Sequence, residues 1–366
     1  MAVAESPICS FATSTSASSH AASDHHQRNL SATVTITATT TTTTTTTAAS
    51  SASTASSSPS GKHHHYTHHH GPSYSSISLS QVTAAKGIVT VLWDELPAWR
   101  QDNHFITSGY RRETFSFRQC ASSLLYLHNE SVNIYSHLIG SLFFLIVLGI
   151  TLNIFLPRYD STSASDFVVF VIFFIGAVLC LGMSSTYHCL NCHSESVAKF
   201  GNRLDYLGII FLIIGSFVPA IFYGLHPIPH YMPIFLALVC GLGTICTVLT
   251  LRHEFALPKW RPFRALMFVV FGLSGVIPMT FAGFKYGFHE LVDRTELPLL
   301  ITEGGLYIAG AAIYAARVPE RFKPGKFDIF GSSHQIFHVC VVTAAVFHLV
   351  AIIGAYKFCH GQRAGF

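Results

Sequence analysis

The sequence predicts an all-α membrane protein, a bundle of seven transmembrane helices. Half of the 366 residues are hydrophobic and only 11% are charged, a composition that is foreign to ordinary soluble domains. The apolar residues gather into runs of about 20, enough to cross about 30 Å of hydrocarbon at 1.5 Å per residue. None of these runs alternates with a period of two, so the pattern favours helices over a transmembrane barrel.

The apolar runs define seven expected spans and four regions of the chain. The spans are Ser136–Leu156, Phe167–Tyr187, Leu204–Leu225, Tyr231–Leu251, Ala265–Phe284, Leu297–Val318 and His334–Tyr356. The regions are a tail (1–80), a segment before the membrane (81–135), the helix bundle (136–357) and a short tail beyond the membrane (358–366).

The first 80 residues are rich in Ser, Thr, Ala and His, and Thr39–Thr47 is an unbroken threonine run. Such a composition buries too little apolar surface to offset the entropy of ordering, which predicts disorder. Six histidines between His63 and His70 either bind zinc or copper loosely or form a solvated tract. The aromatic and acidic residues from Trp93 to Trp99 predict a short amphipathic helix on the membrane surface.

The distribution of Lys and Arg predicts the orientation of the bundle. Seven spans place the two ends of the chain on opposite sides. From Lys86 onward, fifteen basic residues fall on the N-terminal side and five on the other. The five are Arg158, Lys285, Arg294, Lys357 and Arg363. Because basic loops stay in the cytoplasm, we expect the N-terminus to be cytoplasmic.

Polar residues at the ends of three spans predict a functional site. His188 ends the second span, Asp205 begins the third, and His334 and His338 open the seventh. The i, i+4 spacing of the last pair places both imidazoles on one helix face. With the N-terminus inside, all four residues lie at the cytoplasmic side. Ionisable groups at membrane depth mark functional sites, and three histidines with an open position suit catalytic zinc.

Other polar residues allow competing interpretations. Cys189, Cys192 and His193 match the C-x-x-C-H pattern of haem attachment, and with His188 they also form a possible thiolate-rich zinc site. Glu303 either bonds a neighbouring helix or lines a cavity. We interpret His137 and His348 as packing residues, as lone histidines in helices usually are. His348 lies about 15 Å along the helix from His338, too far to share one metal ion.

Several short motifs carry a resemblance to a known family. They are His128–Asn133, Tyr135–His137, Ser184–His188, Cys192–Ser194, Leu204–Tyr206, Arg317–Asp328 and Ser333–His338. In sequence and order they resemble the progestin and adipoQ receptor family, which includes adiponectin receptors, bacterial hemolysin III proteins and fungal Izh-type proteins. The resemblance runs from about Trp93 to the end of the seventh span and leaves out the tail.

The resemblance implies seven helices, a cytoplasmic N-terminus and a zinc ion near the cytoplasmic face. The family's three histidine ligands fall on His188, His334 and His338. Its acidic residue, which holds a zinc-bound water, falls on Asp205. Its small hydroxyl residue falls on Ser184, one helical turn before the first histidine.

Three functions remain open from the sequence. The first is a zinc-dependent hydrolase of lipid amides, ceramidase-like as the resemblance suggests, with Asp205 and Ser184 as catalytic residues. The second is a receptor with a structural zinc that responds to a small or lipid ligand. The third is a role in zinc, sterol or lipid homeostasis; direct zinc transport fits least, because the ionisable groups form one main cluster. We expect a multi-pass protein of the plasma membrane or endoplasmic reticulum, with ceramide or a sterol-like lipid as partner and no nucleic acid.

Overall fold

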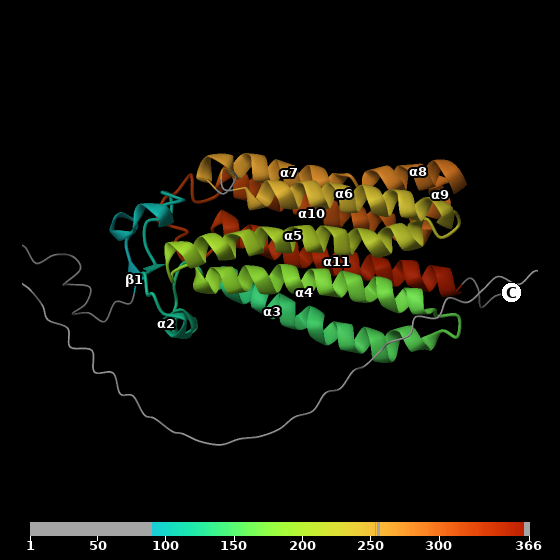
Figure 1. Cartoon of the computed structure of the whole chain (residues 1–366), viewed down its shortest axis with the longest axis horizontal. Coiled ribbons are helices and arrows are strands. Elements are labelled where there is room, and N and C mark those ends of the chain that lie inside the picture. The colour runs from blue at the N-terminus through green and yellow to red at the C-terminus, as the bar shows by residue number, and fades with distance from the viewer. Residues whose placement is uncertain (1–89, 253, 255–256, 362–366) are drawn as a thin grey trace, which may run out of the picture. The chain divides into compact units, whose positions relative to one another are not determined.

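The computed structural model describes residues 90–252, 254 and 257–361. It confirms seven helical segments that are long and apolar enough to cross a membrane (Figure 1). In chain order they are Ser131–Arg158, Ala164–Leu190, Glu195–Gly224, Pro229–Leu251, Arg261–Tyr286, Leu297–Ala316 and Ser333–Gly361. The threonine run and the histidine-rich tract lie outside the described residues.

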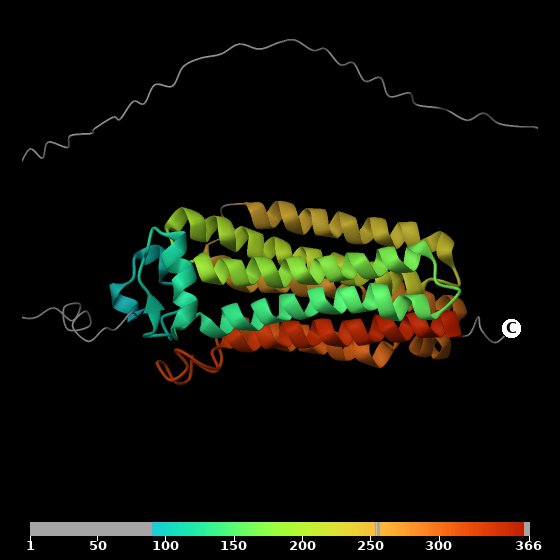
Figure 2. The same cartoon turned by 90° about the horizontal axis from the view of Figure 1, so that it is seen from below.

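The spans are assembled from eleven helical elements, some of them short. They are α3 (Ser131–Ile150), the π-helix η4 (Thr151–Phe155), η5 (Leu156–Arg158), α4 (Ala164–Leu190), α5 (Glu195–Gly224), η6 (Pro229–Tyr231), α6 (Met232–Leu251), α7 (Arg261–Leu273), α8 (Val276–Tyr286), α10 (Leu297–Ala316) and α11 (Ser333–Gly361). Each span packs against the next, and α11 also contacts α3, so the helices close into a ring. Figure 2 shows α3 and α11 side by side along their length.

Two spans differ from the prediction in a way that has a physical cause. Helix α5 begins at Glu195, nine residues before the expected Leu204, so Asp205 lies inside the helix rather than at its start. The fifth span is broken between α7 and α8, just before Pro278. A proline ring clashes with the carbonyl four residues earlier, here that of Ser274, and so interrupts the helix.

Glycines bring α4 and α5 into close contact next to the predicted site. A Cβ atom added to Gly208 would lie 2.9 Å from the Cα of Cys180, and one added to Gly176 would lie 2.6 Å from the carbonyl oxygen of Phe211. Small residues of this kind let membrane helices pack backbone to backbone. The contact therefore fixes the position of Ser184 relative to Asp205. Ser184 lies about one turn from Cys180 on α4, and Asp205 lies less than one turn from Gly208 on α5.

A polar cap of short elements covers the bundle end that carries the site. These elements are β1 (Thr90–Val91), η1 (Trp93–Glu95), η2 (Ala98–Arg100), β2 (Tyr110–Arg111), α2 (Phe117–Ser122) and η3 (Ser123–Leu125). Strands β1 and β2 pair antiparallel, with Thr90 opposite Arg111. The expected amphipathic helix at Trp93–Trp99 is therefore wrong: the segment forms two single 3₁₀ turns, and a six-residue helix follows later.

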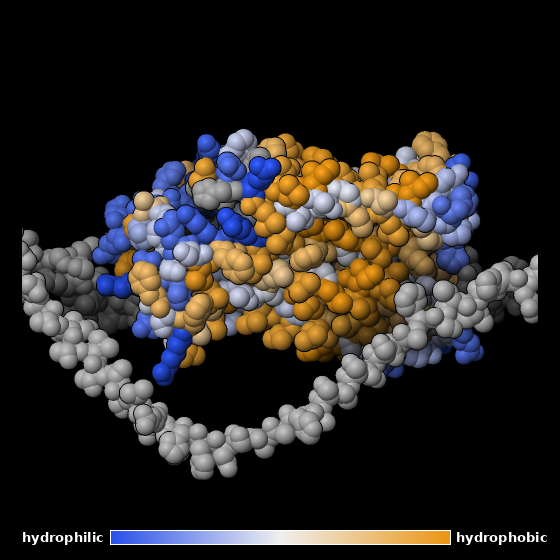
Figure 3. Space-filling view, in the orientation of Figure 1, coloured by the Kyte–Doolittle hydropathy of each residue, from blue (hydrophilic) through white to orange (hydrophobic). Residues whose placement is uncertain are grey.

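The surface has the hydropathy profile of a membrane-spanning bundle. On the face seen in Figure 3, a broad apolar region covers the middle, and hydrophilic residues gather at both ends. Large apolar side chains of α3 such as Ile139 and Ile146 are more than 60% exposed. The remaining short elements are η8 (Pro258–Trp260) and α9 (Phe288–Thr295). Helix α11 runs to Gly361, so the predicted tail from residue 358 begins as helix.

Candidate metal centre

The structure brings the three predicted histidines together at the capped end of the bundle. His188 lies in the last turn of α4, and His334 and His338 lie in the first turns of α11. Each offers one ring nitrogen, and these nitrogens lie within 4.8 Å of one another. His188 and His338 are almost fully buried. In the part of the chain that the structure describes, no other group of three or more His, Cys, Asp or Glu side chains is close enough to hold a metal ion.

Hydrogen bonds fix two of the three imidazoles through the nitrogen that faces away from the cluster. The Nδ1 of His188 lies 2.8 Å from Oε2 of Glu130. The Nδ1 of His338 lies 3.1 Å from the backbone carbonyl oxygen of Asn133. Each Nδ1 therefore donates its proton, which leaves Nε2 with a free lone pair. The Nε2 of His188 is buried and has no hydrogen-bond partner among the described residues.

Glu130 is the site residue that sequence reasoning missed. Its Oε1 accepts a hydrogen bond of 2.9 Å from Nδ2 of Asn191, and its Oε2 accepts one of 2.5 Å from Nδ2 of Asn133. Burial raises the pKa of Glu130, but the His188 imidazole and the hydrogen bond from Asn133 lower it by more, so its pKa lies well below the usual value. A carboxylate behind a histidine ligand orients the ring and raises its basicity. The only signal in the sequence was its place in the motif His128–Asn133.

The helix ends that carry the histidines are themselves held by charged side chains. Arg111 is buried and donates hydrogen bonds to the carbonyl oxygens of His188 and Cys189, at 2.5 and 2.8 Å. A cation at a helix C-terminus satisfies unpaired carbonyls and complements the helix dipole. At the start of α11, the buried Glu320 carboxylate accepts a hydrogen bond of 2.8 Å from the backbone N–H of Ser333. An anion is favourable at that helix end for the same reason.

Asp205 and Ser184 line a large cavity that reaches the histidine cluster. The cavity has a volume of about 680 Å³, is mostly apolar, and includes His334 and His338 in its wall. The Ser184 hydroxyl is buried and has no hydrogen-bond partner among the described residues. The two predicted catalytic residues therefore line the same cavity as His334 and His338, Ser184 from α4 and Asp205 from α5.

The comparison with known proteins identifies the family. Residues 125–349 match the family described as Haemolysin-III related. The chain belongs to this family. It is 43% identical over 288 residues to the "ADIPOR-like receptor IZH2" of Saccharomyces cerevisiae, which covers 78% of this chain and 90% of the yeast protein.

Animal and plant proteins of the family are also similar to this chain. The "Adiponectin receptor protein" of Drosophila melanogaster is 44% identical over 258 residues, 70% of this chain and 57% of the fly protein. The "Heptahelical transmembrane protein 1" of Arabidopsis thaliana is 36% identical over 263 residues, 71% of this chain and 79% of the plant protein. The chain is therefore a seven-helix membrane protein of the adiponectin receptor group.

The residues of this haemolysin-III related chain fit a zinc ion. Three imidazole nitrogens within 4.8 Å of one another form the donor set of a catalytic zinc site. Two of the rings have the partners on Nδ1 that metal-binding histidines usually have. The unpartnered buried Nε2 of His188 would be costly without such a ligand.

Two alternative interpretations of the sequence are resolved by the structure. Cys192 lies with its Sγ 3.5 Å from the Sγ of Cys120, and the ring of His193 packs against Phe117. These residues do not converge with His188 on a second cluster. Glu303 both bonds a neighbouring helix and lines the cavity: its Oε2 lies 2.8 Å from Nδ1 of His348. The interpretation of His348 as a packing residue is therefore incomplete.

Proposed function

We propose that this protein is a zinc-dependent intramembrane hydrolase of lipid amides, with ceramide as the substrate class. The observation that carries the proposal is the position of the histidine cluster, of which His334 and His338 line one end of a large apolar cavity. A metal-binding cluster alone suits a structural site. A cluster that opens into a space large enough for a lipid, with a carboxylate in its wall, suits hydrolysis.

The division of labour follows from the side chains. His188, His334 and His338 would hold the zinc ion, which supplies a Lewis acid that polarises a carbonyl and makes water nucleophilic near neutral pH. Asp205 would accept a proton from the attacking water as general base. The water oxygen bonds to the amide carbon, the C–N bond breaks, and the proton held by Asp205 passes to the departing amine. The Ser184 hydroxyl would donate a hydrogen bond to the oxygen that gains negative charge.

The cavity supports a lipid substrate. Its wall is built mainly from apolar side chains of α5, α7, α8 and α10, which would solvate an acyl chain. Ligand sites in proteins combine such walls with a few polar groups that fix orientation. Here the polar groups at the histidine end would orient the amide, and the acyl chain would extend into the membrane-embedded part of the cavity.

Ceramide hydrolysis by purified protein in detergent tests the proposal. We expect Asp205→Asn to retain its metal and to lose activity by about 100-fold or more, because general base catalysis typically contributes 10²–10⁴. A matched control is Asp293→Asn, a half-exposed residue of α9 that pairs only with the exposed His289. Activity of Asp205→Asn equal to that of the wild type would contradict the proposed mechanism.

A receptor with a structural metal is the second candidate. The yeast and fly relatives are both named as receptors. In this function the histidines would tie α4 to α11, and a lipid in the cavity would shift the bundle between two states. The same variants separate the two functions: loss of a cellular response in Asp205→Asn with unchanged lipid turnover would favour the receptor.

We also propose the cellular setting that the sequence predicts. The excess of basic residues on the N-terminal side supports a cytoplasmic N-terminus, with the polar cap and the histidine cluster on the same side. The membrane would be the plasma membrane or the endoplasmic reticulum. There the protein would contribute to lipid, sterol or zinc homeostasis through the lipids that it cleaves or senses.

A further inference from the structure

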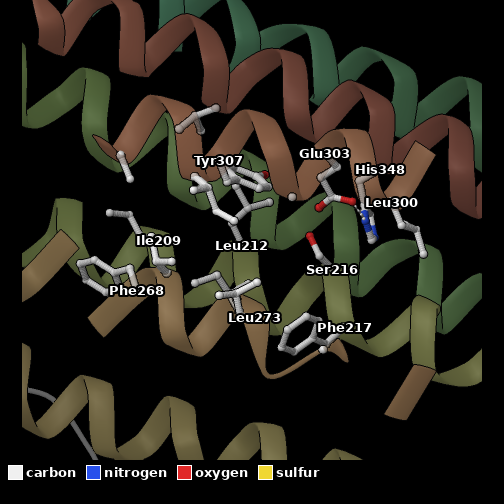
Figure 4. A pocket seen from close by; sticks show the side chains of 18 of the residues that line it. Ile209, Leu212, Ser216, Phe217, Phe268, Leu273, Leu300, Glu303, Tyr307 and His348 are labelled. Atoms are coloured by element: carbon white, nitrogen blue, oxygen red, sulfur yellow. Dashed lines mark hydrogen bonds and ion pairs between the residues drawn. The ribbon is translucent and has the colours of Figure 1, made fainter. Parts of the chain in front are cut away.

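A second group of polar side chains lies in the cavity, far from the histidine cluster. Glu303, His348, Ser216 and Tyr307 all line it. Figure 4 shows Glu303, His348 and Ser216 close together, with Tyr307 further along the cavity beside Leu212. Ser216 belongs to α5, Glu303 and Tyr307 to α10, and His348 to α11. Ionisable residues inside transmembrane segments are functional candidates by default.

The distance between the two polar groups can be estimated independently from the residue spacing along α11 and along α5. His348 lies ten residues after His338 on α11, and Ser216 lies eleven residues after Asp205 on α5. At 1.5 Å per residue, both separations are about 15 Å. Between them the cavity wall is apolar, with Ile209 and Leu212 of α5 pointing into it (Figure 4).

Unsatisfied polar atoms show that the second group is prepared for a ligand. Only one hydrogen bond links its members, from the imidazole Nδ1 of His348 to Oε2 of Glu303. The His348 Nε2, the Ser216 Oγ and the Tyr307 hydroxyl are buried and have no hydrogen-bond partner among the described residues. Buried polar atoms without a partner are rare in native proteins, because each costs about 1–3 kcal/mol.

The chemistry of these atoms selects the group that would bind. With Nδ1 donating to Glu303, the Nε2 of a neutral His348 is an acceptor, and that of a protonated His348 is a donor. The Ser216 and Tyr307 hydroxyls can donate. A hydroxyl group both donates one hydrogen bond and accepts others, so it would satisfy acceptor and donors together. A methylene group would satisfy none of them.

We propose that Ser216, Tyr307, Glu303 and His348 form a second polar subsite, which binds a hydroxyl carried by an amphipathic lipid about 15 Å from the group held at the histidine end. The inference deepens the proposed function and rests on it for the presence of a lipid in the cavity. It selects lipids with a hydroxyl in the middle of a chain over lipids with unsubstituted chains.

Equilibrium binding of radiolabelled stearate, 2-hydroxystearate and 12-hydroxystearate to zinc-loaded protein in detergent tests the subsite. We expect the wild type to bind 12-hydroxystearate about tenfold more tightly than the other two, since one to two buried hydrogen bonds are gained. The double variant Ser216→Ala, Tyr307→Phe should reduce this preference, taken as the ratio of the 12-hydroxystearate and stearate affinities, to within about twofold. These substitutions leave the Glu303–His348 pair intact and so avoid an unpaired buried charge.

A matched control is Ser141→Ala, which removes a buried hydroxyl of α3 that bonds Val178 and does not line the cavity. It should keep the preference. Equal affinity of the wild type for stearate and 12-hydroxystearate, or a preference that survives in the double variant, would overturn the subsite. Because binding needs no turnover, a preference without ceramide hydrolysis would leave the subsite standing while the proposed reaction fails. Ceramide hydrolysis by a protein that shows no preference for 12-hydroxystearate would support the proposed reaction and overturn the subsite.

Discussion

At the scale of single residues, Glu130 connects the polar cap to the candidate metal centre. Its carboxylate accepts the Nδ1 proton of His188, so its charge supports the histidine as a metal ligand. We expect Glu130→Gln to weaken zinc binding about 10- to 100-fold, as is typical when a partner of a metal-bound histidine is changed. Competition with a chromogenic chelator measures the affinity.

The matched control for this variant is Glu195→Gln, which removes a half-exposed carboxylate that pairs with Lys199 at the start of α5. Its zinc affinity should equal that of the wild type. If Glu130→Gln also bound zinc like the wild type, the carboxylate would serve only to hold Asn133 and Asn191 in place.

His128 gives the polar cap a pH dependence. Burial and the nearby Arg111 lower its pKa from 6.5 to about 4. The folded protein therefore holds this imidazole neutral. The contribution of His128 to the free energy of unfolding is complete above pH 6.5 and is lost as the pH falls toward 4. A shift of this size corresponds to about 3 kcal/mol.

Thermal unfolding of purified protein between pH 7.5 and 4.5 measures this effect. We expect His128→Asn to be less sensitive to acid than the wild type, because asparagine does not titrate and can still accept the hydrogen bond that the N–H of Glu130 donates to Nδ1 of His128. Identical pH profiles for the two proteins would show that another group controls acid stability.

A site residue could be predicted from the sequence where its role depends on local structure, and not where its role depends on contacts between distant segments. His334 and His338 were predictable because an i, i+4 pair at the start of an apolar run shares one helix face. His188 and Asp205 followed from the side of the membrane on which their spans end or begin. Glu130 was not predictable from spacing, since it bonds a residue 58 positions away and its role exists only once α3 and α4 pack.

At the scale of elements, the contact between α4 and α5 sets the geometry on which Asp205 depends. Gly208 has no room for a Cβ atom, which would lie 2.9 Å from the Cα of Cys180. We expect Gly208→Ala to destabilise the protein by about 1–3 kcal/mol, the usual cost of overpacking, and to reduce lipid turnover because Asp205 moves relative to His188. Unfolding in denaturant and ceramide hydrolysis measure the two effects.

Gly149 of α3 is a matched control, since a Cβ atom there would meet nothing within 4 Å. Gly149→Ala should be neutral or slightly stabilising, because alanine favours helix over glycine. Equal stability of both alanine variants would mean that α4 and α5 adjust freely and that their contact does not position the site.

Hydropathy predicted the elements but misplaced some of their ends. It detects only the apolar part of a helix, so it missed the polar first turns of α5 from Glu195 to Arg203, which continue the helix beyond the apolar run. It also joined α7 and α8, because the residues around Ser274 remain apolar enough to hide the break caused by Pro278. The polar cap has no periodic pattern, and its fold depends on long-range bonds such as those from Thr107 to Asp328.

At the scale of the whole molecule, the ring of helices lines a large cavity with polar groups at two depths. The histidine cluster lies where α4 ends and α11 begins, beneath the polar cap. The Glu303–His348 pair lies deeper between the helices. The sequence predicted the first cluster through the topology of seven spans. It allowed a cavity beside Glu303 but did not predict its extent, because the cavity walls come from helices that are distant in the chain.

The central claim is that His188, His334 and His338 hold one zinc ion, and the zinc content of purified protein tests it most directly. We expect one zinc ion per chain in the wild type and none in the double variant His334→Ala, His338→Ala, with both proteins folded as judged by circular dichroism. A wild type without zinc, or a double variant that keeps its zinc, would contradict the claim.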